Sequence, residues 1–285
     1  MARTTKMLKN RGGRLQKGEP GGRLPEGLLP AAAPFVIYFL LHGIAVTGVM
    51  SGQGEASQAE LLSASAVADV CAVVAFLFLW RREQCIRGTQ EAKAGGLHGS
   101  VWIGALLSSA AVYLLFNRIM TALGIPEQDA AFQAFSKEWC ELSVLRLLLI
   151  STVLAPVTEE FLFRGFLLRR LCPMLGNRSA IFLSAFLFAL FHGNWTQGIM
   201  AFSMGILLAW VQLRTGCLLL PILMHAGMNA LALLFAVTGI ADYPAGWKLW
   251  VLSALLAPMG IGIVWMQTRD RWDKQNIRKN QKERS

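Results

Sequence analysis

Residues 145–171 read LRLLLISTVLAPVTEEFLFRGFLLRRL, an apolar stretch with three ionisable side chains near its middle: Glu159, Glu160 and Arg164. The stretch is long enough to cross a bilayer as a helix, because about 20 apolar residues span the hydrocarbon core. Charged groups at that depth are costly, so they usually face a bundle interior or a water-filled cavity. The stretch therefore predicts a membrane helix whose polar side lines an internal site.

The whole chain has the composition of a membrane protein. Of its 285 residues, 54% are hydrophobic and 15% are charged, whereas about 25% of the residues of a soluble domain are charged. So many long apolar runs disfavour a soluble α-helical protein and predict an all-α, polytopic transmembrane helical bundle. Eight spans are expected, at about residues 31–50, 61–80, 101–116, 145–171, 179–192, 197–213, 217–237 and 246–266.

The basic residues predict the orientation of this bundle. Lys and Arg concentrate in the cytoplasmic connections of membrane proteins. With eight spans, all but four of the 27 Lys and Arg residues fall on one side. Both termini are therefore expected in the cytoplasm, with a basic tail at 1–30, a bundle at 31–266 and a basic tail at 267–285. The expected location is the cytoplasmic (inner) membrane.

The net charge of +10 fits this topology, and the basic tails are expected to contact anionic lipids of the bilayer. Nucleic acid is not an expected partner, because neither tail interleaves aromatic residues with its charges as a stacking site would. The five cysteines show no C-x-x-C and no paired spacing, so neither a disulfide framework nor a thiolate zinc site is predicted. The first apolar run is too long for a signal peptide and is expected to be a retained span.

The two adjacent glutamates of the opening stretch must serve different faces of a helix, since successive residues point about 100° apart. Glu160 and Arg164 are four residues apart and are expected to pair along one side. This pairing leaves Glu159 free to face a site. Pro156 removes one helical hydrogen bond, so we expect a kink there that admits water.

Two later spans carry histidines. Phe188 and His192 lie one turn apart at the end of the fifth span, which is short for a bilayer, so His192 is expected to lie below the membrane surface. His225 and Asn229 are also four residues apart and share one face near the middle of the seventh span.

These residues supply the groups needed to hydrolyse an amide. Glu159 would accept a proton from a water molecule that His192 orients. His225 and Asn229 would donate hydrogen bonds to a carbonyl oxygen as it becomes negative. Water is the expected nucleophile, because Ser184 and Ser203 have no evident relay beside them.

Three motifs occur in order: EExxxR at 159–164, FxxxH at 188–192 and HxxxN at 225–229. Together they resemble those of the CAAX protease and bacteriocin-processing family (CPBP, or Abi) of intramembrane endopeptidases. The resemblance covers about residues 142–237. It implies a peptide hydrolase whose substrate is a membrane-associated protein or peptide.

The resemblance also implies roles for individual residues. Glu159 matches the proposed catalytic base, His192 the histidine that holds the water, and His225 and Asn229 the oxyanion partners. The positions that shape the site are matched by Glu160, Arg164 and Phe188. Some members are assigned a role without demonstrated proteolysis, so a non-catalytic immunity or structural membrane protein of the same family is an alternative.

A zinc-dependent protease is a further alternative, with Glu159, His192 and His225 as three ligands around an open position. We expect metal-free chemistry with no cofactor, because the H-E-x-x-H motif is absent. Asn229 is also a poor zinc ligand and a good amide donor.

Two further polar residues lie inside the spans. Asp69 lies mid-span, where a proton or solute transporter would place a relay group. No second carboxylate accompanies it there, so we expect an interhelical hydrogen bond instead. His42 is alone on an apolar helix and is expected to pack or to lie at an interface.

Overall fold

The computed structural model describes residues 28–52, 58–87, 96–140, 142–238 and 247–284. These residues are almost all helical, and no β-strand occurs among them, which confirms the predicted all-α bundle. Nearly all of the predicted basic tail at 1–30 lies outside the described residues. The predicted tail at 267–285 continues the last helix as far as Arg284.

Six helices in the described segments contain stretches long and apolar enough to cross a membrane. They are α1 (Leu28–Met50), α2 (Gln58–Arg87), α3 (Gly99–Ala122), α9 (Trp195–Thr215), α10 (Leu219–Thr238) and α11 (Trp247–Arg284). The count rises to seven if a sharply bent helix pair is one span. Eight spans with cytoplasmic termini therefore stay a prediction.

The predicted fourth and fifth spans form one winding unit, Val144–Leu190. It consists of α6 (Val144–Leu147), η2 (Leu148–Leu154), α7 (Ala155–Glu160), η3 (Phe161–Leu168) and α8 (Arg169–Leu190). The segments η2 and η3 are π-helical, a widened geometry that is frequent at functional sites. A break in α8 at Gly176, with φ of 77°, turns the chain back into the bundle.

Proline explains where the first widened segment ends. Pro156 lies in the first turn of α7. Because proline has no N–H, the carbonyl of Thr152 loses its usual helical donor. The Thr152 hydroxyl in turn donates to the carbonyl of Leu148. A π-helical stretch therefore precedes Pro156, and the predicted kink that admits water stays a prediction.

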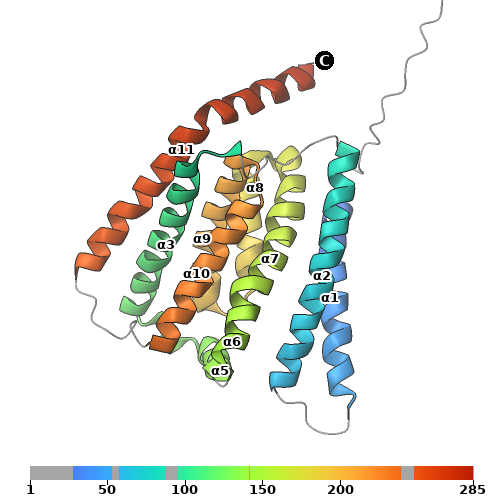
Figure 1. Cartoon of the computed structure of the whole chain (residues 1–285), viewed down its shortest axis with the longest axis vertical. Helices are drawn as coiled ribbons and strands as arrows, with labels where there is room; N and C mark the ends of the chain where they lie inside the picture. The colour runs from blue at the N-terminus through green and yellow to red at the C-terminus, as the bar shows by residue number, and fades with distance from the viewer. Residues whose placement is uncertain (1–27, 53–57, 88–95, 141, 239–246, 285) are drawn as a thin grey trace, which may run out of the picture.

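Figure 1 shows the long helices running up and down in alternation, with the α1–α2 hairpin on one side of the bundle and α11 on the other. The short helices α4 (Ile125–Gln128) and α5 (Ala130–Cys140) follow α3, and α5 lies at the end of the bundle opposite the C-terminus. Aromatic side chains of α2 and η3 build one part of the core, including Phe76, Trp80 and Phe166.

An ionisable pair joins the hairpin helices. His42 Nε2 on α1 lies 3.3 Å from Asp69 Oδ1 on α2. The expected interhelical hydrogen bond of Asp69 is therefore confirmed. His42 lies at the interface of α1 and α2, as expected, but its partner Asp69 was not foreseen, because sequence spacing does not reveal which faces of two helices meet.

Glycines allow α3 and α11 to approach closely. A Cβ atom added at Gly260 would lie 2.5 Å from the carbonyl oxygen of Gly104 and 2.8 Å from the backbone nitrogen of Ser108. Small residues commonly permit such close packing between membrane helices. The position of α11 therefore depends on the missing side chains at Gly104 and Gly260.

We predict that Gly260→Ala destabilises the protein by about 1–3 kcal/mol, the usual cost of overpacking. The matched control is Gly262→Ala on the same helix, where an added Cβ meets no atom within 4 Å. Thermal unfolding in detergent should show a lower Tm for Gly260→Ala alone. Equal Tm values for the two variants would contradict the close contact.

Candidate active site

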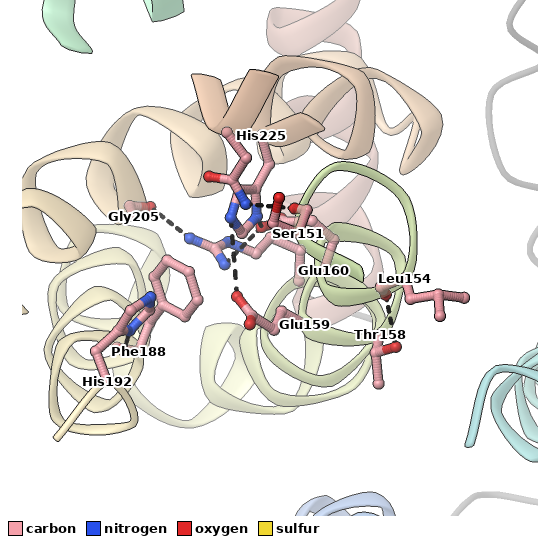
Figure 2. Close-up of polar contacts among 11 residues, drawn as sticks. Ser151, Leu154, Thr158, Glu159, Glu160, Phe188, His192, Gly205 and His225 are labelled. Carbon is pink, nitrogen blue, oxygen red and sulfur yellow. Dashed lines mark hydrogen bonds and ion pairs between the residues drawn. The ribbon is translucent and has the colours of Figure 1, made fainter. Parts of the chain in front are cut away.

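Four parts of the chain bring the predicted residues together. Glu159 and Glu160 end α7, and Arg164 lies in η3. Phe188 lies in the last turn of α8, with His192 in the turn after it. His225 and Asn229 lie on α10. Figure 2 shows the glutamates and His225 facing one another, with Phe188 and His192 on the neighbouring element.

A buried charge network forms the centre of the site. Arg164 and Glu160 both have fully buried side chains, and Arg164 Nη1 donates to Glu160 Oε1 over 2.9 Å. The expected i, i+4 pairing is therefore present. His225 Nδ1 also donates to Glu160 Oε1 over 2.9 Å. Glu160 thus accepts hydrogen bonds from two helices at one oxygen.

The guanidinium of Arg164 has two further partners. Its Nη2 donates to the carbonyl of Gly205 on α9 over 3.3 Å. Its Cζ lies 4.4 Å from the centroid of the Phe188 ring, which allows a cation–π interaction. Arg164 therefore links η3, α7, α8 and α9, and these contacts offset part of the cost of burying its charge.

Glu159 differs from its neighbour in having no hydrogen bond. Its Oε2 is buried and unpartnered, and it lies 3.8 Å from Nε2 of His225. That separation is too long for a direct hydrogen bond and within the range of an ion pair. One imidazole therefore contacts both glutamates, with Nδ1 bound to Glu160 and Nε2 facing Glu159.

His192 lies on the other side of Phe188. Its Nδ1 donates to the carbonyl of Phe188 over 2.9 Å. The Phe188 ring makes edge contacts with both imidazoles, with centroids 4.9 Å from His192 and 5.7 Å from His225. No hydrogen bond or ion pair joins His192 to Glu159 within the described part of the chain, so these two predicted partners are not in direct contact.

Asn229 is held by the first widened segment. Its Nδ2 donates to the carbonyl of Ser151 in η2 over 2.7 Å. A side-chain amide has two N–H groups, so one stays available. Ser151 was missed from the sequence, because a backbone carbonyl in a π-helical turn leaves no mark in the residue types.

A cavity of about 230 Å³ adjoins these residues. His192, His225 and Asn229 line it, whereas Glu159 does not and reaches the site through its approach to His225. The rest of the lining comes from α3, α4, α5, α8, α9 and α10. Its members are Tyr113, Asn117, Met120, Thr121, Pro126, Phe132, Phe188, Thr196, Gln197, Met200, Ala201, Met204, Met228 and Ala232.

Asp129 holds the wall formed by α4 and α5. Its Oδ2 accepts from the backbone nitrogen and the hydroxyl of Thr196, over 2.8 and 2.9 Å. Its Oδ1 accepts from the backbone nitrogen of Phe132 over 3.1 Å. The hydrogen bond from the Thr196 backbone is the main cause that lowers the pKa of Asp129. The helix-start position of Asp129 could have been found in the sequence, but its bonds to Thr196 could not.

The three residues of the zinc alternative do not form a ligand set here. No group of three or more His, Cys, Asp or Glu side chains within the described segments is arranged to hold a metal ion. His225 uses Nδ1 for Glu160, and His192 uses Nδ1 for the carbonyl of Phe188. We therefore derive no step through a metal.

Residues 141–231, which contain all of these motifs, match the family described as type II CAAX prenyl endopeptidase, Rce1-like. This segment is Rce1-like. The match confirms the resemblance to the CAAX protease family, and that family is one of peptidases. The chain as a whole is a multi-pass membrane protein with an Rce1-like core.

One curated relative of this chain is the "Uncharacterized 24.3 kDa protein" of Escherichia coli, which is 32% identical over 146 residues. The aligned part covers 48% of this chain and 64% of that protein. The chain therefore spans slightly less than two thirds of that relative's length. No solved structure matches the chain.

We predict that Glu160→Gln lowers the unfolding free energy by about 3–5 kcal/mol, because it leaves the Arg164 guanidinium buried without its anion. Denaturant unfolding in detergent measures the loss. The matched control is Glu138→Gln on α5, where the side chain is exposed. A loss no larger than that of the control would show that Glu160 does not neutralise Arg164.

We predict that the thermal stability of the protein depends on pH through Asp129. Because its pKa is lowered in the folded protein, its contribution to stability is present above the ordinary Asp pKa of about 3.9. The contribution is lost as the pH falls through the lowered value. Wild type should therefore exceed Asp129→Asn in Tm at pH 7, and this difference should shrink below about pH 4. If the Tm difference between wild type and Asp129→Asn stayed constant over this pH range, Asp129 would not be ionised in the folded protein. The control is Glu127→Gln, at an exposed position.

Proposed function

We propose that this protein is an intramembrane endopeptidase that hydrolyses a peptide bond with an activated water molecule. The observation that carries the proposal is the Glu159 carboxylate, whose buried Oε2 accepts no hydrogen bond from the described residues and lies 3.8 Å from an imidazole whose other nitrogen is held by Glu160. A free carboxylate beside a fixed imidazole can act as a general base. The family match covers the segment that contains these residues and supports peptidase chemistry at the level of the family.

In the proposed reaction, a water molecule lies between Glu159 and the two histidines. Glu159 accepts a proton from the water, and the oxygen of that water forms a bond with the carbonyl carbon of the substrate. His192 has its Nδ1 proton committed to the Phe188 carbonyl, so neutral His192 offers Nε2 as an acceptor that orients the water. The proton on Glu159 then passes to the leaving amine as the C–N bond breaks.

The negative oxygen of the intermediate needs donors. Asn229 commits one N–H to Ser151 and keeps a second for the oxyanion. His225 donates from Nδ1 to Glu160, and in its protonated form it donates from Nε2 as well. Two such donors in a water-poor site stabilise the developing charge.

Glu160 and Arg164 act as positioning residues in this scheme. Glu160 orients His225, and Arg164 neutralises Glu160 while contacting Phe188. We further propose that the enzyme works without a metal in the cytoplasmic (inner) membrane. Its substrate would be a membrane-associated protein or peptide.

We predict that Glu159→Gln lowers turnover by about 10²–10⁴-fold, the usual contribution of a general base, and leaves Tm within about 1 °C of wild type. The comparison is a membrane proteome of cells that produce either form, searched for fragments present only with wild type. Glu138→Gln serves as the matched control. A large loss of Tm with unchanged fragments would instead support a structural role for Glu159.

A further inference from the structure

The cavity reaches the surface at one end of the bundle. Buried Phe188 and His225 form its inner part, and exposed Thr121 lies at its outer part. The lining comes mainly from the last turns of α3, the first turns of α9 and the middle turns of α10, with the end of α8, the turn after it, α4 and α5 completing it. These turns all lie at the same end, so a substrate would enter there.

The two ends of the bundle differ in charge. Most of the described basic residues lie at the end away from the cavity, and the basic final turns of α11 lie there too. The other basic residues at this end are Arg81, Arg82, Arg169, Arg170, Arg178, Arg214 and Arg269. The cavity end carries Arg118, Lys137, Arg146 and Lys248. Figure 1 shows α5 at this end, opposite the C-terminus. Because basic residues concentrate on the cytoplasmic side, the cavity end faces away from the cytoplasm.

The cavity walls carry no acidic side chain, lysine or arginine among the described residues that line them. Four of the lining side chains are methionines, Met120, Met200, Met204 and Met228. Methionine is flexible and apolar, so it adapts to apolar partners of varied shape. A charged side chain would lose its hydration there without meeting an opposite charge among the described lining residues.

We propose that the site takes an uncharged, apolar stretch of a membrane-anchored chain that enters from the non-cytoplasmic side of the membrane. The substrate class rests on the proposed function, whereas the side of access does not. Pro126 and Phe132 form the outer wall of the route, and Asp129 holds this wall to the start of α9. The apolar lining selects the stretch, and the polar residues at the inner end act on its backbone.

The side of access can be tested by labelling. Thr121→Cys is made in a chain whose own cysteines are replaced by serine. A membrane-impermeant maleimide is then added to intact cells, and any outer membrane is permeabilised first. The matched control is a chain that keeps only Cys85, which is exposed in the last turn of α2 at the basic end. Thermal unfolding checks that both chains are folded.

We expect Thr121→Cys to be labelled at least tenfold more in intact cells than in inside-out vesicles. The chain with Cys85 alone should show the reverse. The opposite pattern for both chains would overturn the proposal. The labelling pattern of both chains should stay the same when Glu159→Gln is added. The test of the side of access therefore does not depend on hydrolysis.

The substrate class is tested with two single-span reporter proteins that carry the same apolar stretch, one on each side of the membrane. Wild type should cut the reporter with the stretch on the non-cytoplasmic side, and Glu159→Gln should not. A lysine inside the stretch should reduce cutting at least tenfold. Preference for the cytoplasmic reporter, or indifference to the lysine, overturns the proposal. Cutting that persists in Glu159→Gln overturns the proposed function instead.

Discussion

The structure depends on one fully buried guanidinium. A charge in an apolar bundle is tolerated only if its partners replace the lost water. Arg164 meets most of this requirement through Glu160, the Gly205 carbonyl and the face of Phe188, although its Nε has no hydrogen-bond partner among the described residues. Because these partners lie on α7, α9 and α8, the arginine fixes the relative positions of the helices that carry the site. The buried charge is therefore the constraint from which the geometry of the site follows.

This constraint separates the roles of two adjacent glutamates. Glu160 uses one carboxylate oxygen to accept from both Arg164 and His225. Glu159 points along another face, makes no hydrogen bond at Oε2 and stays 3.8 Å from His225. Neutralisation of the first carboxylate leaves the second for the proton transfer that we propose. The π-helical segments on either side of α7 change the rotation of the helix and so set which face each glutamate presents.

The sequence predicted local features and missed those between helices. The all-α bundle follows from apolar run length, and the Glu160–Arg164 pair follows from i, i+4 spacing. The bond from His225 to Glu160 and the place of His192 beside Phe188 depend on how helices rotate against one another. Spacing within one helix cannot report that rotation. The link from Asp129 to Thr196 escaped prediction for the same reason, since 67 residues separate its partners.

The most direct test of this account is a double-mutant cycle of Glu160→Gln and Arg164→Met, read as unfolding free energy in detergent. If each charge is present to neutralise the other, the double variant should be more stable than Glu160→Gln alone. The coupling energy should then approach the upper part of the range of about 0.5–3 kcal/mol seen for interacting residues. Losses that simply add, with no coupling, would show that the buried arginine does not organise the site.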